Sequence, residues 1–353
     1  MANFSKSALI AMSGGVDSAV AALLVKEQGF NCVGVTLRLF DNEDIGEDNQ
    51  KACCSLEDAL IAENVANRME IPFYVFNLTE DFKEQVIARF VNEYLEGSTP
   101  NPCIDCNRYI KFHRLFLRTS QLGMDYLVTG HYAQVEENNG RFLLKKGVDH
   151  TKDQSYVLYA MTQDQLSRSM FPLGGLTKTE VREIASRHGF ANAKKPDSQD
   201  ICFVRDGDYA NFISQYANSI PGDFVDTNGQ VLGRHNGHIR YTIGQRKGLG
   251  MAFGKPMYVC AKNPQTNTVT LSDNAGLFSK SFYAKDFNLI TPNIPAKVKA
   301  KIRYNQVEQC AIARQIDNNR VYVEFDQPQR AIAKGQAVVL YDGNIVVGGG
   351  TIE

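Results

Sequence analysis

The chain has 353 residues, of which 43% are hydrophobic and 22% charged, and its formal net charge is −1. At roughly 150 residues per domain, this length predicts two or three domains, and the composition excludes disordered, collagenous and fibrous proteins. No apolar run approaches the ~18 residues of a membrane helix, and eight cysteines are too few for a disulfide-stapled secreted scaffold. We therefore expect a globular protein of the cytoplasm that does not bind a membrane.

The first 205 residues alternate short apolar runs with longer amphipathic segments. Strands are expected at residues 7–12, 32–37, 73–76 and 126–129, and helices of ten or more residues after Asp17, Ser55, Glu80 and Asn107. Such alternation is typical of an α/β domain, in which a doubly wound, mostly parallel sheet of the Rossmann type carries helices on both faces.

Two local signals complete this first domain. Asn139-Gly140 lies between two apolar runs, residues 133–135 and 142–145, and predicts a β-hairpin added to the sheet. Thr177 and Glu180 have the spacing of a capping box and predict a helix that ends at Gly189.

Beyond residue 205 the segments become short and are broken by glycine, asparagine and proline, and from about residue 280 the apolar pattern has a period of two. This change predicts an α/β domain at residues 1–205, a small mixed central domain at 206–280 and a C-terminal β-barrel at 281–353. The last two are mildly basic, whereas the first is acidic, which permits nucleic acid at the C-terminal side.

A glycine-containing loop follows the first strand and leads directly into a helix. Two glycines there allow backbone N–H groups to approach an oxyanion at the positive end of the helix dipole. The loop is neither a Walker A loop nor a dinucleotide fingerprint. It resembles the SGGxDS loop of the ATP-pyrophosphatase (PP-loop) superfamily. The expected nucleotide-binding residues here are Ala11, Met12, Ser13, Gly14, Gly15, Val16, Asp17 and Ser18.

Asp17 stands in this loop although a carboxylate repels phosphate. Its presence suggests that Mg²⁺ lies between the carboxylate and the phosphate of ATP. The alternative is a tight glycine turn in which Ser and Asp merely cap the helix.

The nucleotide should lie at the carboxyl ends of the strands. Leu37 ends the second strand and Gly130 the fourth, so both should border it. His131, next to Gly130, is expected to point toward the substrate, the alternative being a strand-end histidine whose ring is satisfied within the protein.

Two cysteine segments are candidates for chemistry. Cys106 opens an expected helix at residues 108–122, and the helix dipole would lower the pKa of its thiol. Cys202 follows a polar loop and could be exposed. A zinc site built from Cys53, Cys54, Cys103 and Cys106 is an alternative, although adjacent cysteines rarely chelate one tetrahedral ion.

Six motifs in order along the chain resemble the bacterial tRNA-specific 2-thiouridylases. They are the loop at 13–18, TPNPCIDCNRYIKF at 99–112, TGHY at 129–132, KDQS at 152–155, KPDSQDICF at 195–203 and YTIGQRKGLG at 241–250. The resemblance implies an ATP-dependent sulfurtransferase that places sulfur at position 2 of the wobble uridine in tRNAs for lysine, glutamate and glutamine.

The same resemblance implies the roles of the cysteines. Cys202 would carry sulfur as a persulfide received from a donor protein. Cys106 would be the nucleophile that frees the sulfur and would form a transient disulfide with Cys202. The family pattern has Asp where this chain has Cys103, and Cys103, Cys106 and Cys202 could instead hold a [4Fe-4S] cluster.

The resemblance also assigns contacts to tRNA. Asn101, Pro102 and Cys103 would hold the target base, and the remaining contacts would be Lys152, Asp153, Gln154, Arg303, Tyr304 and Gln336, beside His131, which is expected from its place at the strand end. A row of cations at Lys297, Lys299, Lys301 and Arg303 suits a phosphate backbone if one strand carries all four, but a solvated strand face would look the same. For residues 241–250, a structural turn and an RNA contact remain equal alternatives.

Two other classes of function fit parts of the sequence. A small-molecule adenylating ligase could use the same loop, and an RNA-binding module could keep the loop only as structure. Neither would need Cys202, so its replacement by serine distinguishes them from a thiolating enzyme.

Overall fold

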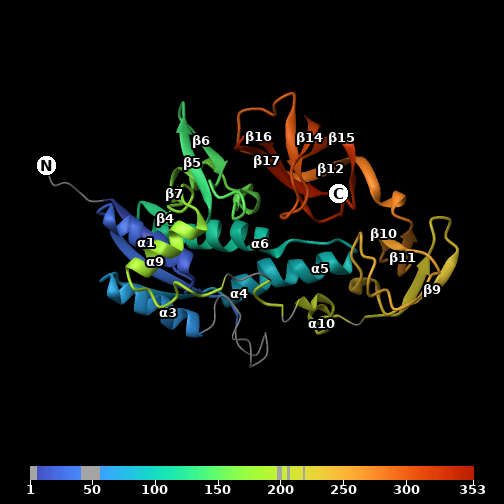
Figure 1. The fold of residues 1–353 in the computed structure, drawn as a ribbon, viewed down its shortest axis with the longest axis horizontal. Coiled ribbons are helices and arrows are strands. Elements are labelled where there is room, and N and C mark those ends of the chain that lie inside the picture. Colours follow the sequence, from blue (N-terminus) through green and yellow to red (C-terminus); the bar gives the residue numbers. More distant parts are fainter. Residues whose placement is uncertain (1–5, 41–55, 197–200, 205–206, 218) are drawn as a thin grey trace. The chain divides into compact units, whose positions relative to one another are not determined.

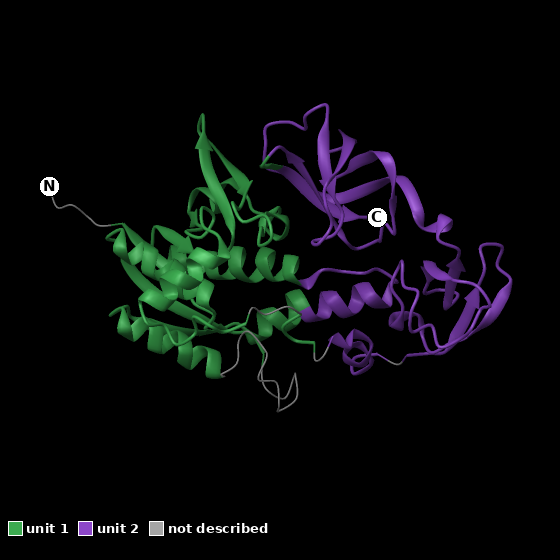
Figure 2. Ribbon diagram, viewed as in Figure 1, with its two compact units in different colours: residues 1–86, 103–205, 344–346 green, residues 87–102, 206–343, 347–353 purple. Residues whose placement is uncertain are grey.

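The computed structural model describes residues 6–40, 56–196, 201–204, 207–217 and 219–353. The chain forms two compact units (Figure 2). Unit 1 comprises Met1–Val86, Cys103–Arg205 and Asn344–Val346, and unit 2 comprises Ile87–Pro102, Asp206–Gly343 and Val347–Glu353. The segment Ile87–Pro102 thus groups with the C-terminal part of the chain.

Unit 1 is built on a five-stranded parallel sheet (Figure 1) whose order is β3-β2-β1-β4-β7. The strands are β1 (Ser7–Ala11), β2 (Asn31–Arg38), β3 (Phe73–Asn77), β4 (Tyr126–Val128) and β7 (Ser169–Met170). The doubly wound α/β fold is therefore confirmed. The central strand β1 is buried on both faces, with Ala8, Leu9 and Ile10 fully inaccessible, as its continuous apolar run requires.

Helices α1 (Val16–Glu27), α3 (Leu56–Arg68) and α9 (Lys178–Arg187) share one apolar core. The predicted capping box is present, because the Thr177 hydroxyl accepts from the Glu180 N–H and the Glu180 carboxylate accepts from the Thr177 N–H. Gly189 ends this helix with φ of +66°.

The two long helical segments are each interrupted by π-helix. The first runs through α4 (Thr79–Phe82), η1 (Lys83–Ala88) and α5 (Arg89–Leu95). The second runs through α6 (Pro102–Asp105), η2 (Cys106–Leu115) and α7 (Phe116–Gln121), so it begins six residues before the expected Arg108. Pro102 explains the earlier start, because proline fits the first position of a helix. Two shorter helices are η3 (Ser155–Leu158) and α8 (Gln163–Ser167).

The expected hairpin exists as β5 (Ala133–Asn138) and β6 (Arg141–Lys146). Asn139 and Gly140 both have positive φ, +51° and +77°, as the tight turn demands. The hairpin does not join the parallel sheet, however: Lys145 of β6 pairs with Ile345 of β17, two hundred residues away. That part of the prediction was wrong.

Unit 2 contains α10 (Tyr209–Ser214), η5 (His238–Arg240) and a four-stranded sheet of order β10-β11-β8-β9. Its strands are β8 (Gly222–Val225), β9 (Val231–His235), β10 (Tyr258–Asn263) and β11 (Thr268–Ser272). Phe224, Tyr241 and Leu271 belong to its core.

After the short helix η6 (Ala275–Leu277), six antiparallel strands form a barrel closed by pairing of β12 with β17. They are β12 (Phe278–Leu289), β13 (Val298–Lys301), β14 (Gln309–Gln315), β15 (Val321–Arg330), β16 (Ala337–Asp342) and β17 (Ile345–Ile352). The expected barrel is confirmed. No helix among the described residues is long and apolar enough to cross a membrane.

Candidate functional site

The loop between β1 and α1 is held by the side chain of its last residue. The Ser18 hydroxyl accepts from the Ser13 N–H at 3.1 Å and donates to the Gly15 carbonyl at 3.0 Å. Gly15 is the N-cap of α1, and no side chain caps the helix there. Ser18 therefore fixes the loop without occupying the first N–H groups of the helix.

This arrangement leaves donors for an anion. The backbone N–H groups of Gly14, Gly15 and Val16 have no hydrogen-bond partner among the described residues. Unsatisfied N–H groups at the start of a 12-residue helix attract an oxyanion. The helix-capping alternative is wrong, because neither Ser nor Asp caps α1, and the geometry suits a phosphate.

Two glycines make the close packing of the loop feasible. Gly14 has φ of +74°, and a Cβ on it would lie 2.8 Å from the Asp58 Cα in α3. A Cβ on Gly130, at the end of β4, would lie 2.9 Å from the Asp17 carbonyl carbon and 2.9 Å from the Ser18 nitrogen. The close packing of the loop itself thus requires glycine at position 130.

The flanking residues of the expected nucleotide set are part of the core. Met12, Val16 and Leu37 are buried, with at most 9% of each accessible. The Met12 N–H donates to the Val35 carbonyl at 2.8 Å, which ties the start of the loop to β2. Ala11, the last residue of β1, is half-buried. The backbone of these residues shapes the loop.

Asp17 is engaged by two residues of the protein. Lys178 Nζ lies 2.8 Å from both carboxylate oxygens, and the Tyr132 hydroxyl donates to Oδ1 at 2.7 Å. Lys178 thus compensates the negative charge of Asp17 in the phosphate loop. From the sequence, Mg²⁺ was expected to compensate that charge. One carboxylate is also compatible with Mg²⁺ held mainly by the phosphates of ATP, since Mg²⁺ needs few protein ligands.

The first two candidate cysteines lie at the start of the second helical segment. Cys103 is exposed in α6, directly after Pro102, and Cys106 is half-buried as the first residue of η2; both are reduced. The helix begins at Pro102, so the N-terminal dipole acts in the turn of Cys103 and falls off by Cys106. The argument that a helix start singles out Cys106 is therefore wrong for this chain.

Cys202 lies in a turn anchored by its neighbour. The Val204 N–H donates to the Ile201 carbonyl at 3.1 Å, and Cys202 is reduced and half-buried. Phe203 is 1% accessible, and its ring packs edge-to-face on Phe82 of α4 at 5.7 Å. This buried phenylalanine holds the turn of Cys202 against α4.

The loop and both cysteine segments border one edge of the parallel sheet. Phe82 of α4, which follows β3, also contacts Phe40, two residues beyond β2. The η2 helix packs on α4, where Arg114 binds Asp81 at 2.7 Å. These are the carboxyl ends of the strands, where doubly wound sheets bind ligands.

At the β4 and β7 part of the same edge, aromatic rings pack against one another. Phe112 of η2 lies 5.9 Å from the His131 ring, beyond β4, and 5.9 Å from Phe171, beyond β7. The helix carrying Cys106 therefore spans the edge from β4 and β7 to α4.

His131 itself belongs to the interior. It is 7% accessible, and its Nδ1 bonds the Thr129 hydroxyl at 2.7 Å. Burial, with a smaller contribution from Lys111, lowers the pKa of His131 well below its usual value. This is the alternative of a satisfied strand-end histidine, so the expected substrate contact finds no support.

No group of three or more His, Cys, Asp or Glu side chains in the described ranges could hold a metal ion. Cys103, Cys106 and Cys202 thus do not form a ligand set for an iron–sulfur cluster in this conformation. Cys53 and Cys54, invoked for the zinc alternative, lie outside the described residues, as do residues 197–200 of the motif before Cys202.

The 152–154 segment uses its polar side chains within unit 1. Asp153 accepts from the Gly147 and Ser155 N–H groups, each at 3.1 Å. Gln154 Oε1 accepts from the Tyr132 N–H at 3.0 Å. Asp153 and Gln154 therefore shape the loop, while Lys152 is half-buried.

In unit 2, side chains hold the residues that precede Asn101. Gln336 Nε2 donates to the Thr99 carbonyl at 2.6 Å, and Lys262 Nζ donates to the Ser98 carbonyl at 3.3 Å. Burial lowers the pKa of Lys262 to about 8. Gln336 thus supports the segment that carries Asn101 and Pro102.

The other barrel residues expected to contact tRNA differ in exposure. Arg303 is half-buried and donates to the carbonyls of Ala331 at 2.9 Å and Ile243 at 3.3 Å. Tyr304, in contrast, is 36% exposed. The cationic row is shorter than expected, because β13 ends at Lys301 and begins after Lys297.

Residues 241–250 form a structural turn with a basic tip. Tyr241 is buried, and the Thr242 N–H donates to Gln245 Oε1 at 2.9 Å. Arg246 and Lys247 are exposed, so the structural turn is present and an RNA contact at its basic tip stays a prediction.

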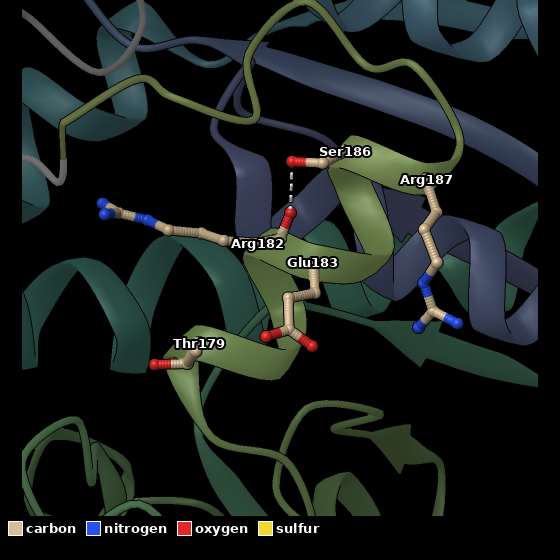
Figure 3. Close-up of a pocket in the computed structure, with 5 residues that line it drawn as sticks. All are labelled: Thr179, Arg182, Glu183, Ser186 and Arg187. Atoms are coloured by element: carbon tan, nitrogen blue, oxygen red, sulfur yellow. Dashed lines mark hydrogen bonds between the residues drawn. The ribbon is translucent and has the colours of Figure 1, made fainter.

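A hollow on α9 is lined by Thr179, Arg182, Glu183, Ser186 and Arg187 (Figure 3). Its lining comes from that helix alone, and Ser186 donates to the Arg182 carbonyl at 2.8 Å. None of the predicted site residues lines it.

Several residues of the site were missed in the sequence. Lys178, Tyr132 and Phe203 lie inside recognised motifs or at the capped helix start, but their partners are distant in sequence. Asn192, whose amide bonds the Gly14 carbonyl at 3.0 Å, carried no local signal.

Together these features define an α/β protein of the PP-loop class with free cysteines at the ligand edge. Consistent with this, residues 6–206 match the tRNA methyl transferase HUP domain model, 210–273 the tRNA methyl transferase PRC-barrel domain and 279–352 the aminomethyltransferase beta-barrel domain. The chain is 51% identical to the tRNA-specific 2-thiouridylase MnmA of Clostridioides difficile (99% of this chain, 98% of the relative). It is 50% identical to that of Carboxydothermus hydrogenoformans (99% and 98%). The chain belongs to the tRNA-specific 2-thiouridylase family, a family of enzymes.

Proposed function

We propose that this chain is an ATP-dependent tRNA sulfurtransferase that replaces the 2-carbonyl oxygen of the wobble uridine by sulfur. One observation carries the proposal: a phosphate loop with unoccupied N–H donors and two reduced cysteines, Cys106 and Cys202, border the same sheet edge. Replacement of a carbonyl oxygen by sulfur needs both an activating phosphate and a sulfur nucleophile.

The first step activates the oxygen. The uracil O2 attacks the α-phosphorus of ATP, the bond between the α-phosphorus and its bridging oxygen breaks, and pyrophosphate leaves. The N–H groups of Gly14, Gly15 and Val16 bind the pyrophosphate, and Lys178 keeps Asp17 neutralised beside it. Mg²⁺ carried by ATP would neutralise further charge on the phosphates.

The second step delivers sulfur. Cys202 carries a persulfide supplied by a sulfur-donor protein, and the Cys106 thiolate attacks its inner sulfur. The S–S bond of the persulfide breaks, and the terminal sulfur leaves as hydrosulfide, attacks C2 and displaces AMP. Cys106 and Cys202 remain as a disulfide, which an external dithiol reduces.

The substrate is tRNA for lysine, glutamate or glutamine, and the target base must leave its stack to reach the loop. Support comes from the exposed Tyr304, Arg246 and Lys247 of unit 2 and from Asn101 and Pro102 beside the cysteines. Tyrosine can stack on a base, and cations bind phosphates. An enzyme of this kind works in the cytoplasm.

Mass analysis of tRNA nucleosides from cells lacking this chain tests the proposal. We expect 2-thiouridine derivatives to disappear, and to return with the wild-type chain and with Cys310→Ser, a control at an exposed barrel thiol. Cys202→Ser should bind tRNA but not restore them. Normal 2-thiouridine in the deleted cells would refute the proposal.

A further inference from the structure

Asn192 approaches the phosphate loop from the protein interior. Its side chain is 3% accessible, and Nδ2 donates to the Gly14 carbonyl at 3.0 Å across 178 positions of sequence. The turn that carries it is fixed, because Phe190 and Ala193 on either side are buried in the core shared with α1. The Ala193 N–H also donates to the Phe190 carbonyl at 3.1 Å.

The direction of this hydrogen bond decides where the next N–H points. In a trans peptide the carbonyl of one residue and the N–H of the next point in opposite directions. A Gly14 carbonyl drawn toward Asn192 in the interior therefore turns the Gly15 N–H away from the interior. That N–H has no partner among the described residues, as expected for a donor that faces a ligand.

The Asn192 amide uses its nitrogen in a hydrogen bond but not its oxygen. Oδ1 is buried and has no hydrogen-bond partner in the part of the chain that the structure describes. A buried acceptor without a partner is destabilising, so the amide carries a cost, and the hydrogen bond that it makes is the donation to the Gly14 carbonyl. Rotating the amide would not help, because it would bring Oδ1 against the Gly14 oxygen and leave Nδ2 unpaired instead. Packing alone thus does not account for an amide at this position.

We propose that Asn192 is a positioning residue of the phosphate loop, which orients the Gly14–Gly15 peptide so that the Gly15 N–H binds the departing pyrophosphate. This inference rests on the proposed function, because it assumes that the loop binds the phosphates of ATP. It concerns the phosphates alone and leaves the adenosine part of the nucleotide to other residues.

Calorimetric binding of pyrophosphate, ATP and adenosine to the full chain tests this role. Asn192→Asp keeps the size of the side chain but sets an acceptor against the Gly14 oxygen. We expect pyrophosphate and ATP to bind about 10- to 100-fold more weakly, the range for loss of a hydrogen bond to a charged group. Adenosine affinity should not change. Asn192→Leu, which avoids the added charge, should show the same selectivity with a smaller loss.

The matched control is Thr119→Val. Thr119 is also fully buried and donates to a backbone carbonyl, that of Leu115 at 2.9 Å, but in α7. It should lower stability without changing the affinity for pyrophosphate. Wild-type pyrophosphate affinity in both Asn192 variants, or equal weakening of adenosine binding, would overturn the inference. Failure of the wild-type chain to bind ATP or pyrophosphate would instead refute the proposed function.

Discussion

Replacing Gly130 by alanine should separate the phosphate loop from the end of β4. The φ of Gly130 lies outside the left-handed region, so alanine is not strained by the backbone there. The added methyl group, however, would lie 2.9 Å from the Asp17 carbonyl carbon and from the Ser18 nitrogen. Both neighbours are backbone atoms and cannot rotate away, so the loop or the strand must move.

The size of the effect follows from these distances. Ordinary contacts of a Cβ begin near 3.4 Å, so the two segments must separate by roughly 0.5 Å. Overpacking of this kind costs about 1–3 kcal/mol of stability, and displacement of a binding group by up to about 1 Å can cost 10²-fold in rate. We expect the variant to unfold at lower urea concentration and to bind ATP at least tenfold more weakly.

Urea denaturation and calorimetric ATP titration measure both quantities. Gly175→Ala is the control, because a Cβ there meets nothing within 4 Å and φ is likewise ordinary. If Gly130→Ala matched wild type in stability and ATP affinity, the packing of β4 against the loop would not be what requires glycine.

Three further predictions concern charge, packing and pH. Lys178→Met should weaken ATP binding about tenfold, because the Asp17 carboxylate would face the phosphates without its cation. Adding Asp17→Asn should restore part of the lost affinity. Calorimetric ATP titrations of the single and the double variant measure both effects. Phe203→Ala should destabilise unit 1 by about 3–5 kcal/mol and speed alkylation of Cys202 by iodoacetamide, measured by mass spectrometry, because the turn loses its buried anchor. Burial lowers the pKa of His131, so its ring is neutral in the folded chain. Below pH ~6.5 the unfolded chain takes up a proton at this residue, and the free energy of unfolding falls by at most about 1.4 kcal/mol per pH unit. In urea titrations, His131→Phe should therefore lose less stability than wild type between pH 7 and 5.

The local parts of this site could be predicted from the sequence. The strand, the glycines and the helix of the phosphate loop are contiguous, so their arrangement depends on few residues. The capping box at Thr177 and the turn at Asn139-Gly140 are also local and were confirmed. In each case the backbone preference of a short segment is sufficient to predict the element, although distant residues complete the phosphate loop.

Predictions failed where distant residues decide. The pairing of Lys145 with Ile345, and the bond from Asn192 to Gly14, join segments with no common local pattern. The two-residue strand β7 is too short to show a period. His131 was expected to face the substrate because it lies beside Gly130 at a strand end, but rings from η2 and from beyond β7 pack against it.

The helix at Cys106 is a different kind of error. Pro102 was a visible start signal, and placing the helix there would have given Cys103 the position in the first turn. The predicted row of four cations was also wrong about the bounds of an element. Strand β13 spans only Val298–Lys301, and Arg303 lies beyond it and donates to the carbonyls of Ile243 and Ala331.

The central claim is that the loop transfers AMP to the carbonyl oxygen that sulfur later replaces. It is tested most directly with tRNA carrying ¹⁸O at position 2 of the wobble uridine, incubated with the chain, ATP and a persulfide donor. The account predicts that each AMP released alongside 2-thiouridine contains one ¹⁸O atom by mass spectrometry. Unlabelled AMP accompanying full thiolation would contradict it.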